Sequence, residues 1–370
     1  FKAAPAFFVA SGRRLWHKGR NLEPAMKSRS SLPVLFAAAL TLVPPGPGAA
    51  QSAASPDAFA VWLKGIYQEG LTRGISKKTL ESALTGLTPI KRVVELDRHQ
   101  PEFTQTFRQY VDQRANAWRI ETGRKRLKTH GELLKAIGSR YGVQPRFIVA
   151  LWGIETNFGR HTGGFSVLRA LATLAFDGRR SAYFRKELFS ALLIVDQGHI
   201  TAAKMKGSWA GAMGQNQFMP SSFLHYAVDH DGDGRRDIWG TLGDVFASAA
   251  NYLRQAGWRG DQTWGREVKL PPSFDDSLKG LMPKSRPKGC RALGKLTATK
   301  TLPEWQALGI RRLDGGALPT RPLAASLALP DGPGGPALLV YRNFRATLSW
   351  NCSLSFAAAV GTLADRVGRR

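Results

Sequence analysis

The amino-acid sequence predicts a mainly α-helical protein of the α+β class, in which a large helical part precedes a small strand-containing sub-domain. Apolar residues recur at helical spacing from residue 57 onwards, as at Phe59, Trp62 and Ile66. From residue 260 to residue 345, Pro and Gly become frequent and the helical period fades. A hydrophobic content of 43% and an aromatic content of 10% are ordinary for a folded protein and argue against disorder over most of the chain.

One helical segment, residues 145–158, differs from the others. Pro145 suits the first turn of a helix, and the following residues are apolar on every face, which predicts a buried helix. Ser76 can cap an earlier helix. The other predicted elements are helices over 166–176, 182–197, 246–256 and 354–367, and strands over 266–270 and 337–341. We therefore expect a core over 57–259, the sub-domain over 260–345, and a segment over 346–370 that returns to the core.

The N-terminal region predicts an export signal over residues 26–50. Met26 opens a short basic stretch, residues 32–43 are apolar, and Gly48-Ala49-Ala50 provides the small residues of a cleavage site. The apolar run is short for a membrane anchor, which is the alternative, and no cysteine follows it to carry a lipid. Residues 1–25 are interpreted as the product of a translation start placed too early, and residues 51–56 as a linker. These features predict a periplasmic protein.

The chain is strongly basic and contains two cysteines. Its formal net charge is +26, and 46 Lys and Arg residues against 26 Asp and Glu residues remain after residue 50. Such a field attracts polyanions, either nucleic acid or a carboxylate-rich cell wall, and export favours the wall. An exported compartment permits a disulfide between Cys290 and Cys352, but two free buried thiols are equally compatible with the sequence.

Glu155 is the strongest chemical feature. It is the only charged residue between Ile148 and Phe158, near the C-terminal end of the apolar helix. Burial disfavours the carboxylate and raises its pKa, and the negative end of the helix dipole acts in the same direction. A carboxyl group that stays protonated near neutral pH can act as a general acid toward a glycosidic oxygen. A buried glutamate that pairs with a basic side chain is the structural alternative.

Two further segments could contact a ligand. Residues 206–223, KGSWAGAMGQNQFMPSSF, combine Gly, Ser and amide side chains with Trp209 and Phe218. Backbone groups in such a loop can approach a sugar while the aromatic rings offer flat faces, although an ordinary tight loop would look similar. Arg179 and Arg180 could meet an anionic group, and a surface pair would have the same sequence.

The segment from Asp229 to Asp237, DHDGDGRRD, matches the first half of a calcium-binding EF-hand loop. Carboxylates stand at positions 1, 3 and 5, and Gly occupies position 6. Position 12, usually Glu, is Gly240, so Asp244 would have to supply the distal carboxylate. An acidic turn without metal is the alternative. We expect a structural Ca²⁺ with these ligands: Asp229, Asp231, Asp233, Arg235 through its carbonyl, Asp237 and Asp244.

Together these segments resemble the lytic murein transglycosylase B family. The matching motifs are GIETNFG at 153–159, RRSAYF at 179–184, GSWAGAMGQNQFMPSS at 207–222, the Asp-rich loop, ANY at 250–252, NF at 343–344 and WN at 350–351. The resemblance covers the chain from about residue 57 to the C-terminus. It implies a lysozyme-like helical core with an additional helical domain and a small strand-containing sub-domain.

The resemblance also implies the roles of individual residues. Glu155 would be the only catalytic carboxylate, and catalysis would need no cofactor. The implied sugar-contacting residues are Ser208, Gln217, Tyr252 and Asn351, with Met219, Trp350 and Phe356 lining the groove. Arg179 and Arg180 are also expected to bind substrate. The family commonly has Tyr where this chain has Trp350 and Phe356, so a hydroxyl contact is expected to be lost at both positions.

A single carboxylate predicts a lytic transglycosylase rather than a two-carboxylate glycosidase. Glu155 would protonate the oxygen between N-acetylmuramic acid and N-acetylglucosamine, then deprotonate the muramoyl 6-hydroxyl to close a 1,6-anhydro ring. A hydrolytic muramidase, a non-catalytic wall-binding protein and a nucleic-acid binder are the alternatives, and export makes the last unattractive. The expected partners are glycan strands and other cell-wall enzymes, not nucleic acid, and the protein is expected to be a monomer. Cleavage within or at the ends of strands is left open.

Overall fold

The computed structural model describes residues 56–99, 105–272, 274, 280–283, 285 and 289–369. The predicted signal peptide, the upstream residues and nearly all of the predicted linker lie outside this part of the chain. Within the described residues, no helix combines the length and the apolar character needed to cross a membrane.

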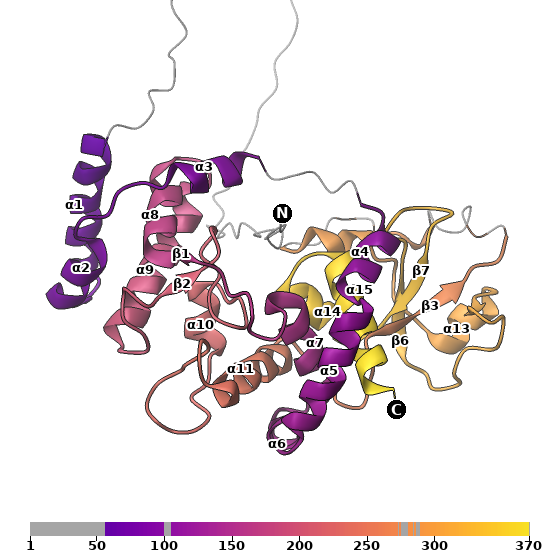
Figure 1. The fold of residues 1–370 in the computed structure, drawn as a ribbon. Coiled ribbons are helices and arrows are strands. Elements are labelled where there is room, and N and C mark those ends of the chain that lie inside the picture. Colours follow the sequence, from indigo (N-terminus) through magenta and orange to yellow (C-terminus); the bar gives the residue numbers. More distant parts are fainter. Residues whose placement is uncertain are drawn as a thin grey trace, which may run out of the picture.

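The fold is mainly helical, and its elements form three groups (Figure 1). The first helices and the helices of the middle region make up a group at one end of the molecule: α1 Pro56–Thr72, α2 Lys77–Leu84, α3 Lys91–Arg98, α8 Val167–Phe176, α9 Ser181–Asp196 and α10 Pro220–Tyr226. Their apolar faces share one core, and α8 packs along α9. Ser76 caps α2 by accepting a hydrogen bond from the backbone N–H of Thr79, as its sequence predicts.

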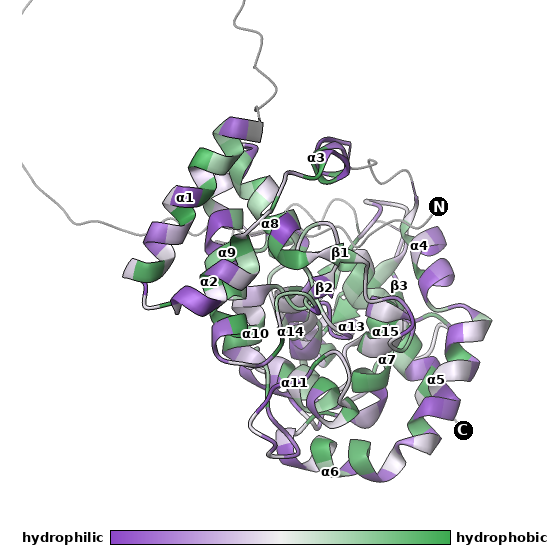
Figure 2. Cartoon of the chain, turned by 60° about the vertical axis from the view of Figure 1, so that its left-hand side comes forward, coloured by the Kyte–Doolittle hydropathy of each residue, from purple (hydrophilic) through white to green (hydrophobic). Residues whose placement is uncertain are grey.

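A second helical group surrounds the apolar helix α7. Its members are α4 Phe107–Arg114, α5 Ala117–Thr129, α6 Gly131–Tyr141, α7 Pro145–Thr156, α11 Leu242–Gln255, α14 Arg342–Trp350 and α15 Leu354–Gly368. The C-terminal helix α15 packs against α4, α5 and α7, so the end of the chain returns to this core. In Figure 2, α7 and α15 carry more hydrophobic residues than the outer helices α3 and α5. A helix that is apolar on every face can be stable only when other elements surround it.

The third group is an antiparallel sheet at the end of the molecule opposite α1 and α2 (Figure 1). Its strands are ordered β4-β6-β7-β3-β5, with β4 Lys300–Thr301, β6 Ala324–Ala328, β7 Ala337–Val340, β3 Gly265–Lys269 and β5 Arg311–Arg312. Helix α13, Leu302–Ala307, packs beside it and buries Trp305, and the 3₁₀ helix η1, Arg291–Lys295, precedes β4. The two strands predicted from sequence are β3 and β7, which pair from Gly265↔Val340 to Val268↔Ala337.

A small two-stranded sheet and a disulfide complete the fold. The short strands β1 Phe165–Ser166 and β2 Lys206–Gly207 pair antiparallel beside α8. A disulfide joins Cys290, just before η1, to Cys352, between α14 and α15, with the two Cα atoms 5.4 Å apart. The structure thereby decides between the two states of these cysteines that the sequence leaves open, and it ties the sheet region to the turn after α14.

Candidate active site

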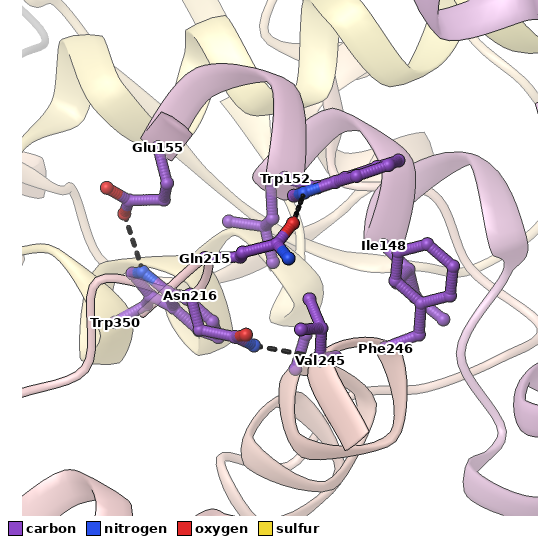
Figure 3. A pocket seen from close by; sticks show the side chains of 10 residues that line it. Ile148, Trp152, Glu155, Gln215, Asn216, Val245, Phe246 and Trp350 are labelled. Atoms are coloured by element: carbon purple, nitrogen blue, oxygen red, sulfur yellow. Dashed lines mark hydrogen bonds between the residues drawn. The ribbon is translucent and has the colours of Figure 1, made fainter. Parts of the chain in front are cut away.

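Glu155 lies in the last turn of α7 and faces a small pocket (Figure 3). Part of its side chain is exposed, but its Oε2 atom is buried. Oε1 accepts a hydrogen bond of 2.7 Å from the indole N–H of Trp350. Among the described residues, none donates a hydrogen bond to Oε2. One carboxyl oxygen is therefore held by the protein, and the other has no partner among the described residues.

The environment of Glu155 favours its protonated form. Burial raises the pKa of this carboxyl from its usual 4.5 to about 7, while the hydrogen bond from Trp350 and the positive charge of Arg114 act in the opposite direction. A group with a pKa near neutrality can donate a proton and later take one back at the same pH. The structure thus gives Glu155 the raised pKa that its place in an apolar helix predicts.

The pocket is mostly apolar and carries two amide side chains. Gln215 accepts a hydrogen bond from the Trp152 indole at 2.8 Å, and Asn216 donates one to the Val245 carbonyl at 2.8 Å (Figure 3). Asn216 Oδ1 is buried without a hydrogen-bond partner in the described residues. The complete lining is Ile148, Leu151, Trp152, Glu155, Gln215, Asn216, Val245, Phe246, Ala249 and Trp350.

Unusual backbone conformations fix the end of α7 just beyond Glu155. Asn157 and Phe158 both have positive φ, 52° and 60°, which costs energy for side chains other than glycine. Thr156 donates to the Gln215 carbonyl at 3.0 Å and accepts from the Gly159 N–H at 3.1 Å. The strained turn therefore docks α7 onto the loop that carries Gln215, which fixes where the carboxyl of Glu155 points.

The loop predicted to contact sugar folds back on itself beside this site. Ser208 N–H bonds the Ala212 carbonyl at 2.7 Å, and a Cβ at Gly207 would lie 2.2 Å from that same carbonyl oxygen, so only glycine fits there. Gln217, with φ 51°, donates to the carbonyls of Thr162 and Gly214. Ser208, Gln217 and Met219 are all nearly buried in the absence of ligand. Their assignment as sugar-contacting residues remains a proposal.

The C-terminal part of the chain supplies an aromatic wall. The ring of Trp350 lies 4.8 Å from that of Tyr252 and 5.1 Å from that of Phe218, and the Tyr252 hydroxyl donates to the Ser349 carbonyl at 2.6 Å. Asn351 follows directly, with its Oδ1 buried and unpartnered among the described residues. The structure thus brings Trp350, Tyr252 and Glu155 together from α14, α11 and α7.

Three of the predicted contact residues have other partners in the structure. Phe356 is only 2% exposed and belongs to the core of α15 and α7, so its ring does not line a groove. Arg179 and Arg180 form ion pairs with the fully buried Asp97 on α3, and Arg179 Nε lies 2.8 Å from Asp97 Oδ2. A buried carboxylate requires paired charges, so these arginines hold α3 against the start of α9. The motif RRSAYF is therefore explained by packing in this structure.

The other carboxylates near Glu155 in sequence have structural partners. Asp177 pairs with Arg98 at 2.7 Å, and Asp196 accepts from the Ser76 hydroxyl. Glu187 accepts from both the N–H and the hydroxyl of Ser221, at 2.8 and 2.7 Å, at the start of α10. None of the three lines the pocket. Within the described chain, Glu155 is the only carboxylate that lines it.

Sequence reasoning missed two residues of α4. The charge of Arg114 acts on Glu155, and its guanidinium also lies 5.2 Å above the ring of Tyr110. Burial is the main cause that raises the pKa of Tyr110, and the charge of Glu155 adds to it. Neither residue belongs to a recognisable motif, and about forty residues separate them from Glu155. Only the packing of α4 beside α7 and α15 shows that they belong to the site.

Three carboxylates form a cluster, two from the Asp-rich loop and one from α11. These three are not the full set of ligands expected from the sequence. Oxygens of Asp229, Asp231 and Asp244 all lie within 4.8 Å of one another, and Asp244 is fully buried. Asp233 accepts from the Arg235 N–H, and Asp237 accepts from the N–H groups of Trp239 and Gly240. Asp244, the distal ligand expected from the sequence, therefore belongs to the cluster with Asp229 and Asp231, whereas the Asp233 carboxylate does not. Converging oxygen ligands of this kind fit Ca²⁺.

The helical fold, with one enclosed carboxyl in a pocket, has the lysozyme-like architecture of lytic transglycosylases. Residues 58–365 match the family model of the transglycosylase SLT domain, and the chain belongs to this family. The resemblance carried by the sequence motifs is thereby confirmed.

Individual relatives agree with this assignment. The chain is 40% identical over 178 residues to the membrane-bound lytic murein transglycosylase B of Escherichia coli, and the match covers 48% of each protein, so the chain spans about half the length of this curated relative. SltB3 of Pseudomonas aeruginosa, crystallised in complex with NAG-anhNAM-pentapeptide, superimposes with a TM-score of 0.77 at 45% identity, covering 84% of this chain and 79% of that one. The Escherichia coli lytic transglycosylase SLT35, in complex with calcium, gives a TM-score of 0.67 at 28% identity, covering 82% and 92%.

Proposed function

We propose that this protein is a peptidoglycan lytic transglycosylase that cleaves the β-1,4 bond between N-acetylmuramic acid and N-acetylglucosamine and forms 1,6-anhydromuramic acid ends. The observation that carries the proposal is Glu155, a single enclosed carboxyl with a pKa near 7 and one oxygen free for a ligand. The relative SltB3, bound to a fragment that contains anhydromuramic acid, supports the same chemistry.

In the first step Glu155 acts as a general acid. Its proton passes to the glycosidic oxygen, the bond between that oxygen and C1 of the muramoyl residue breaks, and the N-acetylglucosamine portion leaves with a free 4-hydroxyl. The N-acetyl oxygen of the substrate stabilises the positive charge at C1. This role usually falls to a second carboxylate, and Glu155 is the only one lining the pocket within the described part of the chain.

In the second step Glu155, now a carboxylate, acts as a general base. It takes the proton from the 6-hydroxyl of the same muramoyl residue while O6 forms a bond to C1, which closes the anhydro ring and restores the acid. No water is consumed. The apolar lining from Ile148, Leu151 and Phe246 limits access of water to the acid and strengthens its electrostatic interactions.

The mass of the products tests the proposal. Digestion of purified peptidoglycan should yield muropeptides with anhydromuramoyl ends, each lighter by one water than the hydrolytic product, when the digest is analysed by mass spectrometry. A hydrolytic muramidase would instead leave reducing ends, and a wall-binding protein without turnover would leave the glycan intact. Either result would contradict the proposed reaction.

We propose further that Asp229, Asp231 and Asp244 hold a structural Ca²⁺. The convergence of their oxygens supports this, and the calcium complex of SLT35 agrees with it. The ion would offset most of the charge of three carboxylates, two in the loop that precedes α11 and one, Asp244, in the first turn of that helix. Helix α11 carries Val245, Phe246 and Ala249 into the pocket, so the ion would stabilise one wall of the site without taking part in proton transfer.

Calcium should therefore raise the thermal stability of protein that has first been stripped with a chelator. At a free concentration about 100-fold above its Kd, the ion should add about 3 kcal/mol to the free energy of unfolding, seen as a higher Tm in calorimetry. Asp244→Asn should abolish most of this response. Asp314→Asn, which removes an exposed acid paired with Arg312 in the sheet region, is the matched control and should respond as wild type does. Equal responses from the two variants would argue against the site.

We also propose a periplasmic location with glycan strands as the partner. The disulfide between Cys290 and Cys352 supports an oxidising compartment, because such bonds are rare in the reducing cytosol. The excess of basic residues supports attraction to a carboxylate-rich polymer.

A further inference from the structure

We propose that Trp350 is a positioning residue that keeps Oε1 of Glu155 in the role of hydrogen-bond acceptor, so that Oε2 alone carries the catalytic proton in both steps. The inference rests on the proposed function for its meaning, but the geometry behind it is independent of the substrate.

The first observation is the asymmetry of the two carboxyl oxygens. Oε1 lies 2.7 Å from the indole nitrogen of Trp350, a short hydrogen bond for a nitrogen donor. Oε2 is buried and has no partner in the described part of the chain (Figure 3). The protein therefore holds Oε1 closely and supplies no hydrogen-bond partner to Oε2 within the described residues.

The second observation concerns the chemistry of the donor. An indole N–H can only donate, whereas a tyrosine hydroxyl can donate or accept. If the acidic proton stood on Oε1, the indole N–H would face a hydroxyl oxygen, which is a weaker acceptor than a carbonyl oxygen, and Oε2 would remain buried without a donor. With the proton on Oε2, Oε1 accepts from Trp350 in the protonated and in the ionised state. The hydrogen bond thus survives the whole catalytic cycle.

The third observation is that Trp350 is held in place from several sides. Its ring packs against Phe218 and Tyr252, at 5.1 and 4.8 Å, and contacts both helical cores. The Tyr252 hydroxyl bonds the Ser349 carbonyl, and the disulfide anchors Cys352 two residues further along. Because its neighbours fix the indole of Trp350, the hydrogen bond sets the orientation of the Glu155 carboxyl group.

The titration of Glu155 follows from these contacts. The donor stabilises the carboxylate more than the acid, so it lowers the pKa that burial raises. The other groups acting on Glu155 are Arg114 and Tyr110, both from α4. Loss of the indole N–H should therefore move the alkaline limit of activity to higher pH by about one pH unit, because a hydrogen bond to a charged group is worth roughly that much.

The sharpest test replaces Trp350 with 3-benzothienylalanine, which has the shape of tryptophan but sulfur instead of the N–H. We expect kcat on peptidoglycan to fall about tenfold, because the carboxyl of Glu155 is no longer oriented. The alkaline limit of the pH–activity profile should move to higher pH. Trp350→Phe should shift the alkaline limit of the pH–activity profile in the same direction. The same isostere at Trp305, whose indole N–H donates to the Ala325 carbonyl in the sheet region, is the matched control and should leave the alkaline limit of activity where it is in wild type.

A readout without turnover separates this inference from the proposed function. The infrared difference between protein with Glu155 and protein with Glu155→Gln, followed through a pH titration, isolates the carboxyl C=O stretch. Removing the indole N–H should raise its frequency and its apparent pKa, because Oε1 then accepts no hydrogen bond. An isostere with an unchanged band and titration would overturn the role of Trp350. If instead the wild-type protein formed no anhydro products while the band shifted as expected, the proposed reaction would fail and the inference would stand.

Discussion

Replacement of Glu155 by glutamine is expected to abolish lytic activity and at the same time to stabilise the folded protein at neutral pH. Glutamine keeps the size of the side chain and an Oε1 that can accept from Trp350, but it cannot donate or accept the catalytic proton. General acid–base catalysis contributes about 10² to 10⁴-fold in rate, so we expect kcat to fall by about 10³-fold or more for a group used in both steps.

The gain in stability follows from the sign of the pKa shift. The folded-state pKa of Glu155, about 7, lies above its usual 4.5, so folding strengthens proton binding. The free energy of unfolding therefore decreases as pH rises from about 4.5 to about 7, and the loss is complete above that range. Glutamine has no charge to desolvate and avoids this cost. Glu155→Gln should add on the order of 2 kcal/mol at pH 8 and little at pH 4.

Both effects can be measured on the same preparation, by muropeptide analysis and by urea unfolding at pH 4 and pH 8. Glu187→Gln is the matched control, because Glu187 is also buried but caps α10 through Ser221, away from the pocket. It should retain activity. A Glu155→Gln protein that kept wild-type turnover would remove the catalytic role, and one that lost stability at pH 8 would show that the carboxylate is well satisfied in the folded state.

Removal of the disulfide is expected to have the largest effect on stability. Cys290 and Cys352 are 62 residues apart, and the chain-entropy relation for a loop of that size predicts that the bond contributes about 4 kcal/mol to the free energy of unfolding. Replacing both cysteines with serine should therefore lower the urea midpoint strongly. Strain or residual structure in the unfolded chain would reduce this effect but leave its direction unchanged.

The variant without the disulfide should also lose activity, because the bond lies close to Trp350 in the chain. Cys352 follows Trp350 and Asn351 directly, and its Sγ accepts from the Ala292 N–H at 3.4 Å, so the bond anchors the turn that presents Trp350 to Glu155. We expect kcat to fall several-fold at temperatures where the variant remains folded, with a smaller change in KM. Reduction of the wild-type protein with dithiothreitol should reproduce both effects, and serine variants insensitive to the reductant provide the control. Unchanged kcat in folded, reduced protein would limit the bond to a role in stability.

The main helices could be predicted because each carries its own periodic signal. Helix α7 was recognisable from an unbroken apolar run after Pro145, and α8, α9 and α15 appear within a few residues of their predicted bounds. The strands β3 and β7 were found for the same local reason. Strands β4 and β5 have only two residues each, and the alanine-rich β6 has no clear alternation, so their pairing depends on residues far along the chain.

Among the site residues, those inside motifs were accessible from sequence, but their contacts were not. Arg179 and Arg180 belong to a shared motif, yet the structure pairs them with Asp97, more than eighty residues earlier. Phe356 also belongs to the matching region, and the winding of α15 turns it into the core. Arg114 carries no motif and acts on Glu155 only because α4 packs beside it.

The sequence by itself determined that Glu155 is the only charged residue between Ile148 and Phe158 of an apolar helix, which predicts that its pKa is raised. These properties follow from residues within one or two turns of the chain. The tertiary structure alone decided which oxygen of Glu155 is held, because the donor, Trp350, lies 195 residues away. It also decided the pairing of the two cysteines and which three carboxylates, Asp229, Asp231 and Asp244, converge. Distances between remote segments depend on how the three cores pack, and no local pattern in the sequence records them.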